Sequence, residues 1–211
     1  MEVLFCGIPN GRTQKVQHQA AHRLLNWQLY QRGCTDFTME YGRLGKPSLQ
    51  AYPQLHFNLS HATGICVSAV GSFPMGVDVE PIRPLRPKVI RRICTEEERQ
   101  LIAQASNPDE AFFRIWTLKE SYVKAIGIGV SYPMQTIALH LEGAAISSNL
   151  PGYRFVQYVL QNRYVLALCT TAPPEEPIHL LATSLERIPI LAETETAHPV
   201  PRQDALFVIY G

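Results

Sequence analysis

The segment Gly76–Glu80, with the sequence GVDVE, constrains the fold of this chain most strongly. Because side chains alternate across a β-strand, Asp78 and Glu80 must share one face, and Val77 and Val79 the other. Two carboxylates on one face repel each other unless a cation or water lies between them. Mg²⁺ beside a polyphosphate prefers such hard oxygen ligands. The alternative is an edge strand with one solvated face.

A second group of polar residues lies in a helix predicted over residues 107–126. Trp116, Glu120 and Lys124 are spaced i, i+4, i+8 and therefore share a face. Glu120 would supply a third oxygen ligand, and Lys124 a cation one turn further on. The alternative is a Glu120–Lys124 surface ion pair worth a few tenths of a kcal/mol. We interpret both groups together as a Mg²⁺–phosphate site, in which Lys124 neutralises phosphate charge.

The order of the predicted elements indicates an α+β fold, because helices and strands mix without a regular βαβ rhythm. Thr95 and Glu98 form a capping box, and prolines 81, 84 and 87 predict an extended connection. Residues 41–49 read as a loop, and the turn at residues 72–75 is the best boundary between two lobes. The predicted elements are strands 3–8, 75–80 and 135–142, hairpins over 56–70 and 153–170, and helices 17–31, 95–105 and 107–126.

Composition excludes several classes of protein. The net charge of +1 gives no general attraction to nucleic acid, and 46% hydrophobic residues are ordinary for a globular protein. The five cysteines form no CxxC pair, so we expect buried free thiols in a reducing compartment.

The longest stretch without Asp, Glu, Lys or Arg, residues 47–77, is too polar to span a bilayer. The N-terminal residues offer no basic region followed by an apolar run, so we expect no signal segment. We expect a cytoplasmic protein that binds no membrane.

Five motifs in order resemble the phosphopantetheinyl transferases, and within them the surfactin-type group. GVDVE is followed about forty residues later by WTLKESYVKAIG at residues 116–127. The upstream motifs are AHRLL at residues 21–25, GKP at 45–47 and FNLSHA at 57–62. The resemblance runs from about Ala21 to Cys169.

The resemblance implies the fold and the reaction. Such enzymes consist of two similar α+β lobes in pseudo-twofold arrangement within one chain, and the ligand lies in the cleft between them. The lobes would be residues 1–75 and residues 76–211, the second carrying the metal site. The reaction moves the 4′-phosphopantetheine arm of coenzyme A to a serine of an apo acyl or peptidyl carrier protein and releases 3′,5′-ADP.

The resemblance also implies the roles of individual residues. Asp78, Glu80 and Glu120 would bind Mg²⁺, Glu120 would act as the base, and Lys124 would stabilise the departing phosphate. The residues that would contact the cofactor are Arg23, Lys46, Ser60, His61, Lys119 and Lys124. Trp116 is assigned to packing.

The expected partner is an acidic carrier protein. Residues 83–93 include five cations and no acid, so they are a predicted docking segment; a solvated flank is the alternative. We expect a monomer. Two other functions remain open: a Mg²⁺-dependent pyrophosphate hydrolase with the same acids, and a carrier-binding module without turnover.

Overall fold

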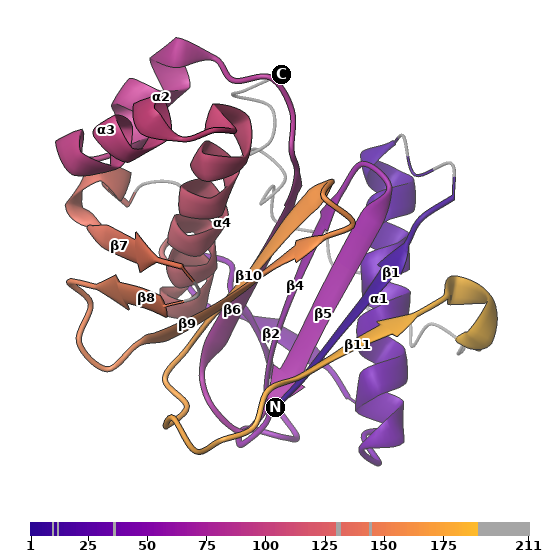
Figure 1. Ribbon diagram of the computed structural model, residues 1–211. Coiled ribbons are helices and arrows are strands. Elements are labelled where there is room, and N and C mark those ends of the chain that lie inside the picture. Colours follow the sequence, from indigo (N-terminus) through magenta and orange to yellow (C-terminus); the bar gives the residue numbers. More distant parts are fainter. Residues whose placement is uncertain (10, 12, 36, 130–131, 144, 190–211) are drawn as a thin grey trace.

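The computed structural model describes residues 1–189 except 10, 12, 36, 130, 131 and 144. Its framework is two sheets, each packed against one long helix (Figure 1). The first sheet has the order β11-β1-β5-β4, and the second has the order β6-β10-β9. Their strands are β1 (Glu2–Gly7), β4 (His56–Ala62), β5 (Ile65–Gly71), β6 (Met75–Pro81), β9 (Arg154–Leu160), β10 (Tyr164–Thr170) and β11 (His179–Thr183). The mixture of helices and strands confirms the α+β class.

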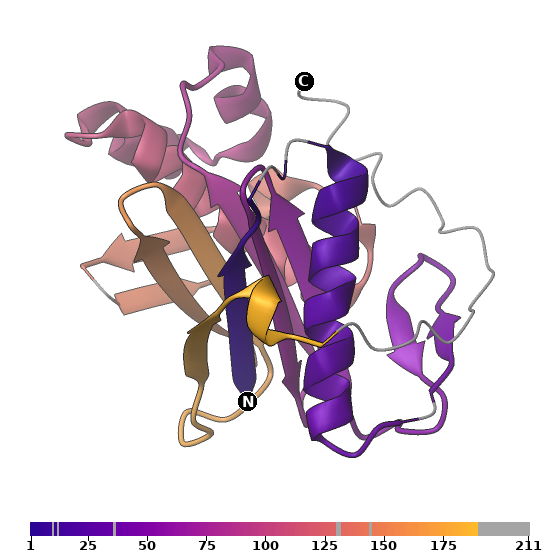
Figure 2. The ribbon, with the colours of Figure 1, turned by 90° about the vertical axis from the view of Figure 1, so that its right-hand side faces the viewer.

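The other elements surround these sheets. Helix α1 (Gln14–Gln31) lies along the strands of the first sheet, as Figure 2 shows, and α4 (Pro108–Ile126) packs on the second. The remaining elements are α2 (Pro87–Ile93), α3 (Glu96–Gln104), the 3₁₀ helices η2 (Met134–Thr136) and η3 (Leu185–Arg187), and two hairpins, β2 (Met39–Tyr41) with β3 (Pro47–Leu49) and β7 (Leu139–Glu142) with β8 (Ala145–Ser148). No helix in the described ranges is both long and apolar enough to cross a membrane.

Most of the predicted elements are confirmed. Thr95 and Glu98 form the expected capping box at the start of α3. The β9–β10 hairpin turns at Gln161 and Asn162, whose φ angles of 53° and 51° suit a two-residue hairpin loop. All five cysteines are buried free thiols, as expected.

Three predictions about local structure are wrong. The extended connection ends at Pro87, which begins α2 because proline is well suited to the first position of a helix. Residues 41–49 were predicted as a loop but include β3 and the end of β2. The strand predicted over 135–142 begins only at Leu139, because the segment before it closes the 3₁₀ turn of η2.

The two sheets meet at β4 and β6, where side chains replace a backbone ladder. Asn58 Oδ1 of β4 accepts the Val77 N–H at 2.8 Å, and Ser60 Oγ accepts the Val79 N–H at 3.4 Å. The division at residues 75 and 76 stays a prediction. Residues 179–183, however, do not lie with the second sheet: β11 pairs in parallel with β1 of the first.

The strand β6 is buried on both faces. Val77 and Val79 belong to an apolar cluster that includes Val3, Val67 and Leu166, so it is shared by both sheets. The opposite face of β6 packs against α4. The alternation therefore divides β6 as predicted, with the valines on one side and the acids on the other.

Candidate active site

A glycine allows β6 and α4 to approach each other closely. A Cβ atom at Gly76 would lie 2.1 Å from the Ser121 carbonyl oxygen and 2.3 Å from the Ala125 nitrogen, both backbone atoms of α4. Such distances are far below van der Waals contact, so only glycine fits. The close approach places the acids of β6 beside the polar face of α4.

Asp78 lies at the centre of this contact. Its Oδ1 accepts hydrogen bonds from Lys124 Nζ at 2.7 Å and from Ser60 Oγ at 2.9 Å. Lys124 Nζ also donates to Ser60 Oγ at 2.8 Å, so the three side chains form a closed triangle. The Asp78 side chain is 2% exposed and that of Lys124 is 22% exposed. The carboxylate is therefore desolvated while the lysine retains access to solvent.

Glu80 is held by two donors. Arg83 Nη1 donates to its Oε2 at 2.6 Å, and Trp116 Nε1 donates to its Oε1 at 3.3 Å. Burial and the Asp78 charge raise the pKa of Glu80, and Arg83 opposes that shift. At 3% exposure, Glu80 does not lie on a solvated edge strand, so that alternative is excluded.

Glu120 is the third buried acid. Burial, followed by the charge of Asp78, raises the pKa of Glu120 to about 8, against the opposing effect of Lys124. Its Oε1 and the Oδ2 of Asp78 are buried and find no hydrogen-bond partner in the described part of the chain. Buried polar atoms without partners are costly in a folded protein. Two unpaired oxygens from neighbouring acids therefore point to a missing ligand.

The described ranges contain no group of three or more His, Cys, Asp or Glu side chains arranged to hold a metal ion. Lys124 pairs with Asp78 Oδ1, and Arg83 and Trp116 donate to the two oxygens of Glu80. The metal ligands Asp78, Glu80 and Glu120 accordingly stay a prediction.

The helix face predicted from sequence is present. Trp116, Glu120 and Lys124 are all buried or partly buried on the side of α4 that meets β6. The Glu120–Lys124 surface pair is therefore not observed, because Lys124 pairs with Asp78. Trp116 packs as predicted, within an apolar cluster and stacked on Phe112 with ring centroids 6.1 Å apart, and its Nε1 also donates to Glu80.

Lys119, predicted to contact the cofactor, lies away from the acids in this structure, and that contact stays a prediction. Its side chain is fully buried, and Nζ donates to Glu98 Oε2, the Ile93 carbonyl and the Met134 carbonyl. An ammonium group has three protons, so none is left for a phosphate. Lys119 is adjacent to Glu120 in sequence, but its side chain points toward α2, α3 and η2.

Two other residues predicted to contact phosphate, Lys46 and Arg23, donate hydrogen bonds to backbone carbonyls in this structure. Lys46 Nζ donates to the carbonyls of Met75 and Ala125, and burial lowers the pKa of Lys46 to about 8. Arg23 Nη2 donates to the Ile188 carbonyl. Neither residue contacts the acids, so their predicted roles remain untested.

His61 follows Ser60 in β4 but lies against α1. Its Nδ1 is 3.3 Å from Gln17 Oε1, and its ring centroid is 6.0 Å from that of His18. The ring centroid of His22 lies 4.1 Å from that of His18, with the two ring planes tilted by 36°. Helical spacing brings His18 and His22 together on α1, and the packing of α1 on β4 adds His61 to the group.

Comparison with known proteins identifies the family. Residues 74–169, which include β6 and α4, match the family model of the 4′-phosphopantetheinyl transferase superfamily. The 4′-phosphopantetheinyl transferase ffp of Bacillus subtilis is 30% identical over 156 residues, which cover 70% of each chain. The chain belongs to this superfamily. The assignment from sequence motifs, including the surfactin-type group, is confirmed.

Other members of the superfamily match a smaller part. The 4′-phosphopantetheinyl transferase psf-1 of Bacillus pumilus is 36% identical over 136 residues, 61% of this chain and 58% of that protein. The chain thus spans about three fifths of the length of this relative. A solved holo-(acyl-carrier-protein) synthase from Bacillus anthracis in complex with CoA (3′,5′-ADP) has 19% identity and a TM-score of 0.40, covering 46% of this chain and 95% of that one.

Proposed function

We propose that this member of the superfamily transfers the 4′-phosphopantetheine arm of coenzyme A to a serine of an apo carrier protein. The observation that carries the proposal is the cluster of three buried carboxylates, Asp78, Glu80 and Glu120, beside the partly exposed ammonium group of Lys124. Desolvated acids of this kind next to a solvent-accessible lysine are typical of a functional site, and a divalent cation held by the acids would let it bind a charged phosphate.

The acids fit a divalent cation by their chemistry. Asp78 and Glu120 offer hard carboxylate oxygens, and one oxygen of each lacks a partner among the described residues. Asp78, Glu80 and Glu120 would hold Mg²⁺, which would neutralise charge on the pyrophosphate of coenzyme A. We also propose that the protein depends on Mg²⁺, is cytoplasmic and acts as a monomer.

The residues of the chain have distinct roles in the reaction. The serine oxygen forms a bond to the β-phosphorus of coenzyme A, and the bond from that phosphorus to the oxygen of 3′,5′-ADP breaks. Glu120, in its ionised form, accepts the serine proton. Lys124, oriented by Asp78 and Ser60, pairs with the departing phosphate.

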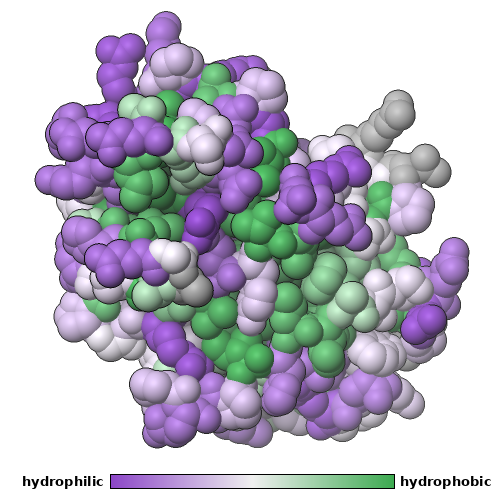
Figure 3. Space-filling view, viewed as in Figure 1, coloured by the Kyte–Doolittle hydropathy of each residue, from purple (hydrophilic) through white to green (hydrophobic). Residues whose placement is uncertain are grey.

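A basic surface next to the acids supports carrier docking on the predicted segment, residues 83–93. A groove of about 160 Å³ is lined by Arg83, Pro84, Leu85, Arg86, Val89, Phe112, Phe113 and Trp116. Arg83 and Trp116 also contact Glu80, so the groove opens beside the acids. Figure 3 shows hydrophilic side chains gathered over α2 and α3 around a smaller apolar area. An acidic carrier with an apolar contact patch fits this surface.

Mass spectrometry of the carrier tests the proposal. The protein is incubated with coenzyme A, Mg²⁺ and a panel of apo carriers, and each carrier is also supplied with its serine replaced by alanine. We expect the mass of one phosphopantetheine group to appear on a carrier, and to be lost with Glu120→Gln or EDTA. Release of 3′,5′-ADP without a modified carrier would favour the hydrolase instead. Carrier binding without transfer would favour a binding module.

A further inference from the structure

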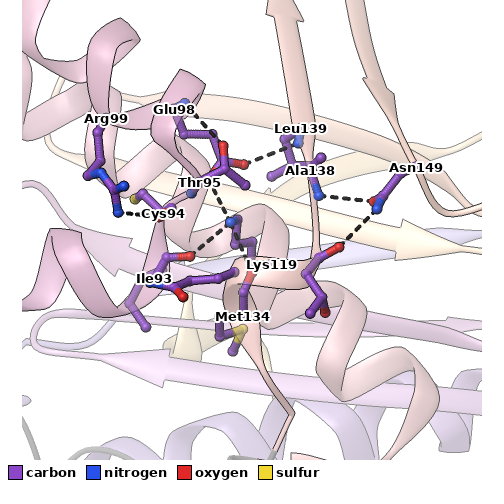
Figure 4. A network of polar contacts seen from close by, with 12 residues as sticks. Ile93, Cys94, Thr95, Glu98, Arg99, Lys119, Met134, Ala138, Leu139 and Asn149 are labelled. Carbon is purple, nitrogen blue, oxygen red and sulfur yellow. Dashed lines mark hydrogen bonds and ion pairs between the residues drawn. The ribbon is translucent and has the colours of Figure 1, made fainter.

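A buried ion pair joins α3 to α4 next to the acids. Lys119 Nζ lies 2.6 Å from Glu98 Oε2, and the two side chains are 0% and 1% exposed. Figure 4 shows that this pair is the centre of a larger polar network. Lys119 immediately precedes Glu120, so the pair anchors the same turn of α4 that carries the proposed base.

Lys119 also holds the end of α2. Its Nζ donates to the carbonyl of Ile93, the last residue of α2, at 2.9 Å, and to the Met134 carbonyl of η2 at 3.0 Å. The last carbonyls of a helix have no partner within the helix, and a cation there also suits the helix dipole. Lys119 therefore fixes where the docking segment, residues 83–93, ends.

Glu98 connects the pair to the N-cap of its own helix and to one further segment, β7. Its Oε2 accepts the Thr95 N–H at 2.8 Å within the capping box, and its Oε1 accepts the Leu139 N–H of β7 at 3.1 Å. Gln135 of η2 donates to the Arg91 carbonyl, which ties η2 to α2 a second time. Five segments thus meet at one buried ion pair.

The Lys119–Glu98 ion pair is better suited to holding segments in position than to stabilising the fold. Burial lowers the pKa of Lys119, and the Glu98 carboxylate opposes that shift, so desolvation offsets much of the attraction between them. Neutral side chains of similar volume often replace buried ion pairs without loss of stability. What such replacements lose is the fixed set of charged hydrogen bonds. In this fold those bonds join the end of α2 to the turn of α4 that carries Glu120.

We propose that Lys119 is a positioning residue that, through Glu98 and the Ile93 carbonyl, places the carrier-docking segment relative to the base Glu120. The inference rests on the proposed transferase function. It gives Lys119 a role toward the carrier protein instead of the coenzyme A contact expected from sequence.

Steady-state kinetics with both substrates test the role of Lys119. In Lys119→Met we expect the KM for the carrier to rise roughly tenfold to a hundredfold, because small displacements of a docking surface are costly. The KM for coenzyme A should change less than about twofold. The double variant Lys119→Met/Glu98→Gln removes the unpaired buried charge. It should therefore recover part of the lost thermal stability, since glutamine still lacks an acceptor for one of the Thr95 and Leu139 N–H groups, while the KM for the carrier stays high.

A matched control separates positioning from loss of stability. Leu29→Ala removes a fully buried side chain of α1, away from the network, and should lower the melting temperature without changing the KM for the carrier. Amide hydrogen exchange supplies a readout besides activity. Exchange over residues 88–93 should accelerate in Lys119→Met, while exchange over β6 should not.

The outcomes are distinct. If the wild-type protein modifies no carrier, the proposed function is rejected, and the positioning role is rejected with it. A wild-type protein that transfers normally, with an unchanged carrier KM in Lys119→Met or equal increases for both substrates, would overturn only the positioning role. If the double variant had the wild-type KM for the carrier, Lys119 would contribute only to stability, and the positioning role would likewise be overturned.

Discussion

The Nζ atom of Lys124 lies 2.7 Å from Oδ1 of Asp78, so an ion pair joins α4 to β6. Lys124→Met would leave the Asp78 carboxylate buried with only Ser60 as a partner among the described residues. We expect a loss of about 1–3 kcal/mol in the free energy of unfolding and loss of transfer. Urea denaturation measures the first effect. The control is Arg32→Met, whose exposed pair with Glu2 should be worth less than about 1 kcal/mol. Equal losses in the two variants would contradict the prediction.

Glu120→Gln should have the opposite effect on stability. The folded protein holds the Glu120 proton up to about pH 8, whereas the ordinary value is 4.5, so the penalty of ionising Glu120 grows as pH rises between these values. Removing that charge should stabilise the metal-free protein by about 1–3 kcal/mol at pH 8 while abolishing transfer. Thermal denaturation in EDTA at pH 5 and pH 8 checks this. A gain of equal size at both pH values would be inconsistent with it.

Gly76→Ala should destabilise the protein severely. The added Cβ would lie 2.1 Å from a backbone oxygen of α4, which cannot move without displacing the helix. We expect a loss of more than about 3 kcal/mol, or no folded protein. The matched control is Gly7→Ala in β1, where the nearest atom to the new Cβ is 3.9 Å away. Equilibrium denaturation of both variants decides the prediction, which fails if they are equally stable.

His22 should contribute to acid denaturation. Burial, followed by the charges of His18 and His61, lowers the pKa of His22 to about 4 from 6.5. The unfolded chain therefore binds the additional proton first, and stability falls as pH decreases from about 6.5 to 4. The effect is at most about 3 kcal/mol. His22→Gln should flatten that part of the curve of unfolding free energy against pH. An unchanged slope between pH 6.5 and 4 would refute this assignment.

Charge reversal on α2 should weaken carrier recognition. Arg91 and Arg92 are exposed within the docking segment. In the double variant Arg91→Glu/Arg92→Glu we expect the KM for an acidic carrier to rise about tenfold or more at low salt, and the KM for coenzyme A to stay unchanged. The control, Arg32→Glu/Arg187→Glu, makes the same charge change elsewhere on the surface. A similar carrier KM in both double variants would argue against this docking surface.

Local periodicity made much of the site predictable. The two-residue repeat of a strand places Asp78 with Glu80, and the helical repeat places Trp116, Glu120 and Lys124 on one face. The capping box at Thr95 and the hairpin at Gln161 and Asn162 are equally local. These features depend on backbone geometry over a few residues, so one sequence suffices to read them.

Motif membership was a poorer guide to the roles of side chains. Lys119 and Lys124 are both lysines of the same motif, five residues apart. One is fully buried against Glu98 and the other reaches solvent beside Asp78. A spacing of five residues turns the helix so that the two side chains leave it in different directions. Which of those directions meets the acids depends on the segments packed around α4.

The sequence by itself determined the superfamily, the α+β class, the paired acids of β6 and the polar face of α4, because each follows from short-range repeats or from motifs in order. Only the tertiary structure decided that α4 meets β6 at Gly76, that Lys124 pairs with Asp78 while Lys119 is buried with Glu98, and that β11 joins the first sheet. These contacts join segments tens of residues apart, and they form where burial of apolar surface and pairing of buried charges are satisfied together.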